Sequence, residues 1–123
     1  MKIECRSFGF KNGADAHADF VFDVRCLPNP FYVPELKQKT GMDAEVRDFV
    51  MNHESAQVLQ EKLFDLMDFL IPQYIAEGKS QLVVAFGCTG GKHRSVVFSE
   101  LVYKHISANG INASINHRDI TKA

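Results

Sequence analysis

The pattern of hydrophobic and polar residues changes along the chain, from segments typical of strands to segments typical of helices. Residues 2–8 and 20–25 are short runs rich in β-favouring side chains, and the second run stops at Pro28 and Pro30, which cannot donate ladder hydrogen bonds. The continuous apolar run within residues 81–86 is typical of a strand covered on both faces, as in a parallel sheet. A short segment at 111–117 follows the last helical pattern closely and is expected to return as a parallel strand.

Three other segments repeat apolar residues at spacings of three and four, which predicts helices. A short helix is expected after Asp43 as its cap, and a longer one after Ser55. Pro72 should kink or end the longer helix, and Gly78 should terminate it. The third helix follows residue 95. The pattern therefore predicts a small α/β domain with an open, mainly parallel sheet flanked by helices.

Composition limits the class of protein further. The 123 residues, 46% hydrophobic and 24% charged, suit one compact domain over residues 1–123, without repeats or a flexible linker. A formal charge of −1 gives no overall basic field for nucleic acid. The chain lacks a signal-like start and an apolar stretch of about 20 residues, so we expect a cytoplasmic protein without membrane contact. Three scattered cysteines predict free thiols.

The segment 87–95, GCTGGKHRS, joins the buried strand to the third helix and is the main candidate for chemistry. Gly90 and Gly91 allow positive φ and close backbone approach, so that amide groups and the helix N-terminus can face one anion. Further donors come from the side chains of Thr89, Lys92, Arg94 and Ser95. The strand–phosphate loop–helix unit predicts binding of a phosphate ester, or of a phosphate or sulfate ion. The loop lacks the Walker order of residues, so ATP is not implied.

The same loop also permits a catalytic alternative. Cys88 is followed by five residues and then by Arg94 and Ser95, a spacing that resembles the cradle of cysteine-dependent phosphatases, with Cys88 as nucleophile. Gly87 stands where those enzymes usually carry histidine, and no leaving-group acid can be assigned. We therefore favour a domain without catalytic residues and keep a phosphatase using Cys88 and Arg94 as the alternative.

Polar residues at the carboxyl ends of parallel strands should meet in one crevice. This adds Arg25, Asn29, His117 and Arg118 to the candidate site, although a buried salt bridge with Asp23 is the preferred role of Arg25. His93 could donate to phosphate or face solvent at the start of the helix. The remaining histidines are scattered, which predicts neither a metal site nor a cofactor. The full set of expected ligand residues is Cys88, Thr89, Gly90, Gly91, Lys92, His93, Arg94, Ser95, Arg25, Asn29, His117 and Arg118.

With this loop, the motifs SFGFKNG (7–13), ADFVFDVR (18–25), LPNP (27–30), TGMD (40–43), EGKS (77–80) and HRD (117–119) make the chain resemble the C-terminal domain of the RapZ (YvcJ-like) RNase adapter family. The resemblance covers essentially the whole chain. It implies a metabolite sensor for glucosamine-6-phosphate that, in one branch, also binds small regulatory RNA. It further implies that Thr89, Gly90, His93 and Arg94 contact the sugar phosphate.

Three departures from the family pattern change these expectations. The family's kinase-like domain with a Walker loop is absent here, so we expect a free-standing sensor domain. Phe31 stands where the family often has a histidine ligand contact. The end of the chain offers only Lys122 in place of a basic tail, so RNA binding would need a patch around Lys92, Arg118 and Lys122, in a homo-oligomer.

Overall fold

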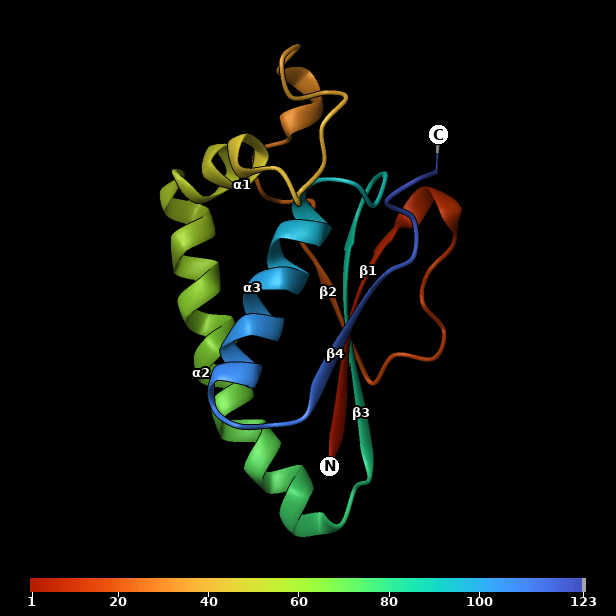
Figure 1. The fold of residues 1–123 in the computed structure, drawn as a ribbon, viewed down its shortest axis with the longest axis vertical. Coiled ribbons are helices and arrows are strands. Elements are labelled where there is room, and N and C mark those ends of the chain that lie inside the picture. The colour runs from red at the N-terminus through yellow and green to blue at the C-terminus, as the bar shows by residue number, and fades with distance from the viewer. Residues whose placement is uncertain (123) are drawn as a thin grey trace.

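The computed structural model describes residues 1–122, which fold into one sheet and a layer of helices (Figure 1). In chain order the described elements are β1 (Lys2–Gly9), the 3-10 turn η1 (Phe10–Asn12), β2 (Phe20–Asp23), the 3-10 turn η2 (Pro30–Tyr32), α1 (Ala44–Met51), α2 (Glu54–Glu77), β3 (Gln81–Cys88), α3 (Arg94–Ala108) and β4 (Ala113–His117).

The sheet has the strand order β2-β3-β1-β4, and each neighbouring pair is parallel. The predicted α/β class and parallel sheet are thus confirmed. β3 lies inside the sheet, as its continuous apolar run predicts. The connection from β1 leads past β3 to β2, and the connection from β3 leads past β1 to β4. The chain therefore leaves these two adjacent strands in opposite directions. At that point Gly9 and Cys88 are register partners at the carboxyl ends of their strands.

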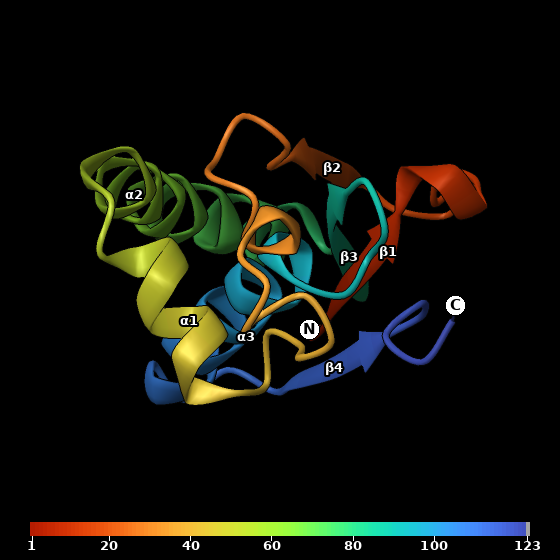
Figure 2. The ribbon, with the colours of Figure 1, turned by 90° about the horizontal axis from the view of Figure 1, so that it is seen from above.

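The helices α1, α2 and α3 lie on one side of the sheet, and the segment after β1 lies on the other (Figures 1 and 2). Helix α3 packs directly on β1, β3 and β4. Alternate residues of β1, namely Ile3, Cys5 and Ser7, are fully buried, as expected of a strand face covered by helices. On the open side, Asp15 in the segment after β1 accepts hydrogen bonds from Arg6 at 3.2 Å.

The boundaries of α2 differ from the sequence prediction. Ser55 was expected to cap the helix, but His53 is the N-cap and the helix begins at Glu54. Pro72 lies inside the helix, which continues to Glu77. Pro72 is exposed, so water can satisfy the carbonyl that loses its helical partner. Gly78, left-handed with φ 94°, ends the helix as predicted.

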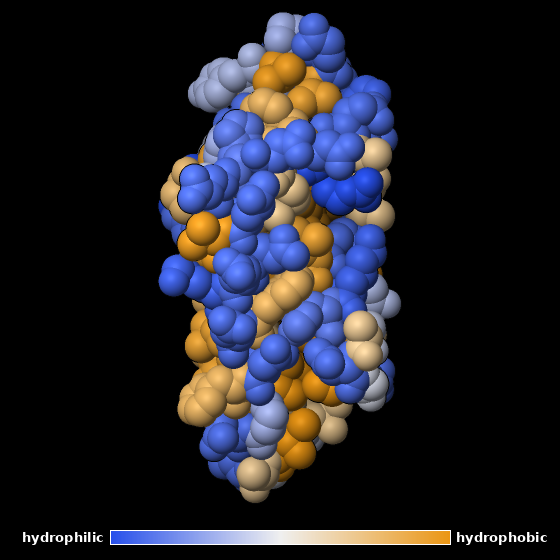
Figure 3. All heavy atoms as spheres, turned by 90° about the vertical axis from the view of Figure 1, so that its left-hand side faces the viewer, coloured by the Kyte–Doolittle hydropathy of each residue, from blue (hydrophilic) through white to orange (hydrophobic). Residues whose placement is uncertain are grey.

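The helix-covered face mixes hydrophobic and hydrophilic residues at its surface (Figure 3). Several large apolar side chains of α2 are exposed, namely Val58, Leu66, Phe69 and Ile75. The homo-oligomer expected from the sequence stays a prediction. Within the described residues, no helix is both long enough and apolar enough to cross a membrane.

Candidate anion-binding site

A cavity of about 520 Å³ opens at the carboxyl end of β3, beside the N-terminus of α3. It lies next to the point between β1 and β3 where the chain leaves two adjacent strands in opposite directions, which is where open α/β sheets bind ligands. The described residues lining it are Lys11, Asn29, Phe31, Tyr32, Lys37, Gln38, Cys88, Thr89, Gly90, Lys92, His93 and Arg94. The phosphate loop predicted from the sequence therefore forms one wall of this cavity.

The loop 89–93 is packed between two glycine-containing segments. Gly91 has φ +79°, and a Cβ there would lie 2.5 Å from the Gly9 nitrogen. On the other side, Gly41 donates its amide hydrogen to the Lys92 carbonyl at 2.8 Å, and a Cβ on Gly41 would lie 2.7 Å from the His93 carbonyl oxygen. Gly90 instead faces open space and lines the cavity. The backbone of the loop is thus fixed from both sides while its tip stays accessible.

Arg94 is the first residue of α3, and it is 5% exposed. Its Nη1 donates to the Arg25 carbonyl at 2.7 Å and to the Leu27 carbonyl at 3.0 Å. Its buried Nε has no hydrogen-bond partner among the described residues. A buried, unsatisfied donor on a guanidinium group is costly in free energy, so this nitrogen is a candidate for an anionic ligand in the cavity that Arg94 lines.

His93 is neither a solvent-facing side chain nor a simple phosphate donor. The ring is buried, and its Nε2 lies 2.7 Å from the Lys39 carbonyl, which can only accept. Burial lowers the pKa of His93, as do the cations Arg94 and Lys92, against the opposing effect of the Lys39 and Lys37 carbonyls. The neutral ring therefore uses its proton on Nε2 and keeps an acceptor lone pair on Nδ1. That lone pair suits a hydroxyl or ammonium group better than a phosphate oxygen.

Cys88 ends β3 and is 2% exposed. Its thiol donates to the Ser95 hydroxyl at 3.1 Å. Ser95 is fully buried and does not line the cavity, so it supports Cys88 rather than a ligand.

The sequence predicted only some of the positive charges that line the cavity. Lys11, Lys37 and Lys92 join Arg94 in the lining, and none of the described lining residues carries a carboxylate. Lys11 follows β1 directly, so the rule that ligands gather at strand carboxyl ends could have found it. Lys37 and Gln38 come from an irregular segment whose position no local pattern predicts.

Five of the predicted site residues lie outside the described lining of the cavity, namely Gly91, Ser95, Arg25, His117 and Arg118. Arg25 pairs with Asp23 at 2.6 Å, so the preferred ion pair is present. Both side chains are nearly half exposed, however, and the expectation of a buried bridge was wrong, because the edge strand β2 ends at solvent. His117 contacts Ser7 and Glu100 at 2.6 and 2.7 Å, and Arg118 pairs with Asp119.

Sequence comparison relates this chain to known proteins. A family model described as the RapZ C-terminal domain matches residues 1–121. The chain belongs to the RapZ C-terminal domain family. The resemblance carried by the loop and the dispersed motifs is therefore confirmed.

Relatives of this RapZ C-terminal domain are named nucleotide-binding proteins. One from Caldicellulosiruptor saccharolyticus is 57% identical over 122 residues, which cover 99% of this chain and 42% of the relative. Another from Alkaliphilus oremlandii is 55% identical over 117 residues, covering 95% and 40%. A third from Clostridioides difficile is 53% identical over 119 residues, covering 97% and 42%. The chain thus spans about two fifths of the length of these relatives.

No set of three or more His, Cys, Asp or Glu side chains within residues 1–122 is grouped so that it could hold a metal ion. The described lining of the cavity of this RapZ C-terminal domain offers cations, neutral polar groups and the Cys88 thiol.

Proposed function

We propose that this RapZ C-terminal domain is a sensor or adapter domain that binds a phosphorylated amino sugar, such as glucosamine-6-phosphate, without converting it. The observation that carries the proposal is the cavity lined by three lysines and a buried arginine, with no carboxylate among its described lining residues. A dianion entering this cavity meets only attractive charges and the amide groups of the loop.

The rest of the cavity supports a sugar as the group attached to phosphate. Asn29, Gln38 and Thr89 are neutral residues that can exchange hydrogen bonds with hydroxyl groups. The aromatic residues Phe31 and Tyr32 supply apolar lining, which ligand cavities typically combine with a few polar groups. The Nδ1 lone pair of neutral His93 can accept from a hydroxyl or an ammonium group.

The name of the relatives is compatible with the same site. Nucleotides and sugar phosphates share the phosphate group that the loop would recognise, and they differ in the part that contacts the rest of the cavity. A nucleoside monophosphate therefore serves as the competitor that distinguishes the two ligand classes.

Glucosamine-6-phosphate should raise the melting temperature of the domain by several degrees. Ligand at 100 times its dissociation constant adds about 2.7 kcal/mol to the stability of a folded protein. Inorganic phosphate should give a smaller rise, and glucosamine without phosphate none. Differential scanning fluorimetry of the folded chain measures these shifts, with adenosine monophosphate as a fourth ligand. If neither phosphate-bearing sugar nor phosphate shifts the melting curve, the proposal is wrong.

The contact between Cys88 and Ser95 favours a second candidate, the cysteine-dependent phosphatase. In that chemistry a hydroxyl beside the sulfur would stabilise a thiolate facing bound phosphate. Here the thiol is almost fully buried, and no described carboxylate lines the cavity to protonate a leaving group. RNA binding by an adapter domain stays a prediction. The basic patch expected for it is weakened, because Arg118 and Lys122, two of its three cations, are paired with Asp119.

Thiol labelling separates the binding domain from the phosphatase. Cys26 is exposed, whereas Cys5 and Cys88 are buried. Burial raises the pKa of Cys5 to about 12, helped by the negative charges of Glu100 and Glu4, so Cys5 stays protonated at pH 7. We expect iodoacetamide at pH 7 to modify Cys26 alone, as mass spectrometry would show. Rapid, phosphate-protected labelling of Cys88 would instead support the phosphatase.

A further inference from the structure

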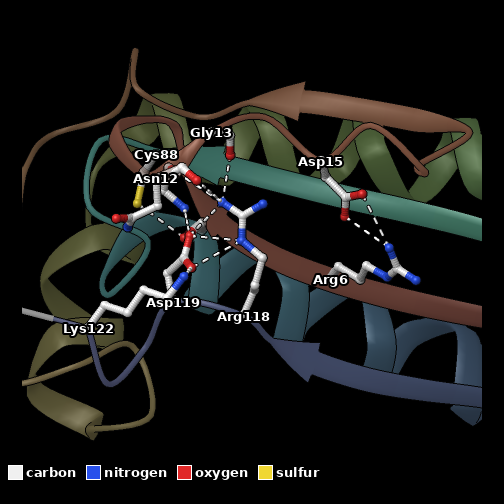
Figure 4. Close-up of polar contacts among 10 residues, drawn as sticks. Arg6, Asn12, Gly13, Asp15, Cys88, Arg118, Asp119 and Lys122 are labelled. Atoms are coloured by element: carbon white, nitrogen blue, oxygen red, sulfur yellow. Dashed lines mark hydrogen bonds and ion pairs between the residues drawn. The ribbon is translucent and has the colours of Figure 1, made fainter.

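The end of the chain forms a strap, residues 117–122, across the carboxyl ends of β1 and β4. Arg118 donates its amide hydrogen to the Ser7 carbonyl at 3.0 Å, and its Nη2 donates to the Gly13 carbonyl at 2.5 Å. Figure 4 shows the Arg118 guanidinium between Asp119 and the segment that carries Asn12 and Gly13. The strap therefore joins β4 to the turn that follows β1.

Asp119 is the buried residue of this strap that contacts both the strap and β1. Its side chain is fully buried, and it contacts Arg118 and Lys122 at 2.8 Å each. Its Oδ2 also accepts the Gly9 amide hydrogen at 2.7 Å. Burial opposes ionisation of Asp119, but the hydrogen bonds from Arg118, Gly9 and Lys122 outweigh it and hold its pKa well below the usual range. The group is a carboxylate at neutral pH.

The Gly9 amide that Asp119 holds belongs to the backbone on which the phosphate loop rests. A Cβ on Gly9 would overlap the Gly90 carbonyl carbon, and a Cβ on Gly91 would lie 2.9 Å from the Asp119 Cβ. Beside them, Lys11 donates its amide hydrogen to the Thr89 carbonyl at 3.2 Å. A shift of Gly9 would therefore move the loop and the segment that brings Lys11 to the cavity.

A carboxylate so close behind an anion-binding loop would repel phosphate if its charge were uncompensated. Arg118 and Lys122 supply two positive charges in direct contact with it, which removes this penalty. Replacing the charge by an apolar side chain would remove the acceptor of the Gly9 amide. The arrangement thus combines a rigid support with local charge balance.

We propose that Asp119 is a positioning residue, which fixes Gly9 and through it the direction of the Gly90 and Gly91 amide groups toward bound phosphate. This inference rests on the function proposed above. Asp119 does not touch the ligand; it acts through the backbone of β1.

Asp119→Asn tests the proposal, with Asp15→Asn as the matched control. Asp15 is also a mostly buried carboxylate paired with an arginine, Arg6, but it lies away from the loop (Figure 4). We expect Asp119→Asn to weaken binding of glucosamine-6-phosphate and of inorganic phosphate about tenfold, because a neutral amide is a weaker acceptor for the Gly9 amide hydrogen and loses the charge contacts with Arg118 and Lys122. Asp15→Asn should leave both affinities within about twofold. Isothermal titration at a temperature where every variant is folded measures them.

Amide spectra provide a readout that loss of stability alone would not change. In two-dimensional nitrogen–proton spectra, Asp119→Asn should shift the Gly9, Gly90 and Gly91 signals, and Asp15→Asn should not. If wild-type protein binds phosphate and Asp119→Asn binds it equally well, the positioning role is overturned while the proposed function stands. If wild-type protein binds neither ligand, the phosphate site itself is wrong and the inference falls with it.

A second pair of variants decides the matter if Asp119→Asn does not fold. Lys122→Met removes the exposed lysine that pairs with Asp119. Lys79→Met removes a partly buried lysine that pairs with Asp19 at the opposite end of β3. The two variants change the net charge equally. Lys122→Met should weaken phosphate binding about threefold and shift the Gly9 amide signal, because Asp119 is then less well held. Equal affinities and unshifted Gly9 signals in both variants would overturn the proposal.

Discussion

Replacing Arg94 with alanine will abolish the rise in melting temperature that glucosamine-6-phosphate produces. The Nε of Arg94 is the buried donor without a described partner, and it belongs to a residue that lines the cavity. Loss of a charge-assisted hydrogen bond in a buried site costs about 1.5–3 kcal/mol, or roughly tenfold to a hundredfold in affinity. Titration calorimetry and thermal denaturation both measure this loss.

Arg94 also stabilises the protein without ligand, so the control must separate the two roles. Arg94→Ala leaves the carbonyls of Arg25 and Leu27 without their donor and should lower the melting temperature of the free protein. Lys104→Ala removes an exposed charge farther along α3 and should preserve both the stability and the ligand shift. A folded Arg94→Ala variant that keeps the full ligand shift would contradict the assigned role of the guanidinium.

Replacing Gly91 with alanine will destabilise the protein more than replacing Gly90 or Gly110 with alanine. The substitution places a side chain at φ +79°, where L-residues are strained by about 1–2 kcal/mol. It also sets a methyl group 2.5 Å from the Gly9 nitrogen and 2.8 Å from the Phe8 carbonyl carbon, both of them backbone atoms. Because backbone in the sheet cannot move aside cheaply, we expect a loss of about 3 kcal/mol or more in the free energy of unfolding.

Two other glycines provide matched controls for this prediction. Gly110 has nearly the same φ, +78°, but no described atom lies within 4 Å of its Cβ position, so Gly110→Ala should cost only about 1 kcal/mol of strain. Gly90 lies next to Gly91, does not have a positive φ and faces open space, so Gly90→Ala should stay within about 0.5 kcal/mol of wild type. Urea unfolding measures the series. Equal losses at positions 91 and 110 would show that close packing against Gly9 contributes nothing.

These glycine contacts also explain why the loop is suited to binding. Its backbone is held between Gly9 and Gly41, so the cost of ordering the loop is already met when the protein folds. The binding free energy of a phosphate ester can then appear as affinity rather than being spent on arranging the loop.

The sequence alone predicted the parallel α/β fold and the glycine-rich loop between β3 and α3, because local residue patterns specify both. That this loop binds phosphate stays a prediction. The apolar run before Gly87 identifies an interior strand, and the glycines with their following cation and hydroxyls identify a loop at a helix N-terminus. Even the end of α2 at Gly78 follows from one residue. Of the two effects expected of Pro72, only the end of the helix is contradicted, because α2 continues through Pro72 to Glu77.

The composition of the cavity depended on the tertiary structure. Lys11 and Lys37 come from segments far from the loop in sequence, and only the folding of the chain places them in one lining with Arg94. The same holds for the lowered pKa of His93, which depends on burial and on the neighbouring cations Arg94 and Lys92.

Local sequence thus determined which elements form and where an anion would meet backbone amides, since strand and helix periods and glycine conformations act over a few residues. The tertiary structure decided which distant charges face the cavity and which are neutralised. Arg118 pairs with Asp119 rather than lining the cavity, and Asp119 instead holds the backbone on which the loop rests. Electrostatic interactions of this kind depend on distances across the folded chain, which no local pattern encodes.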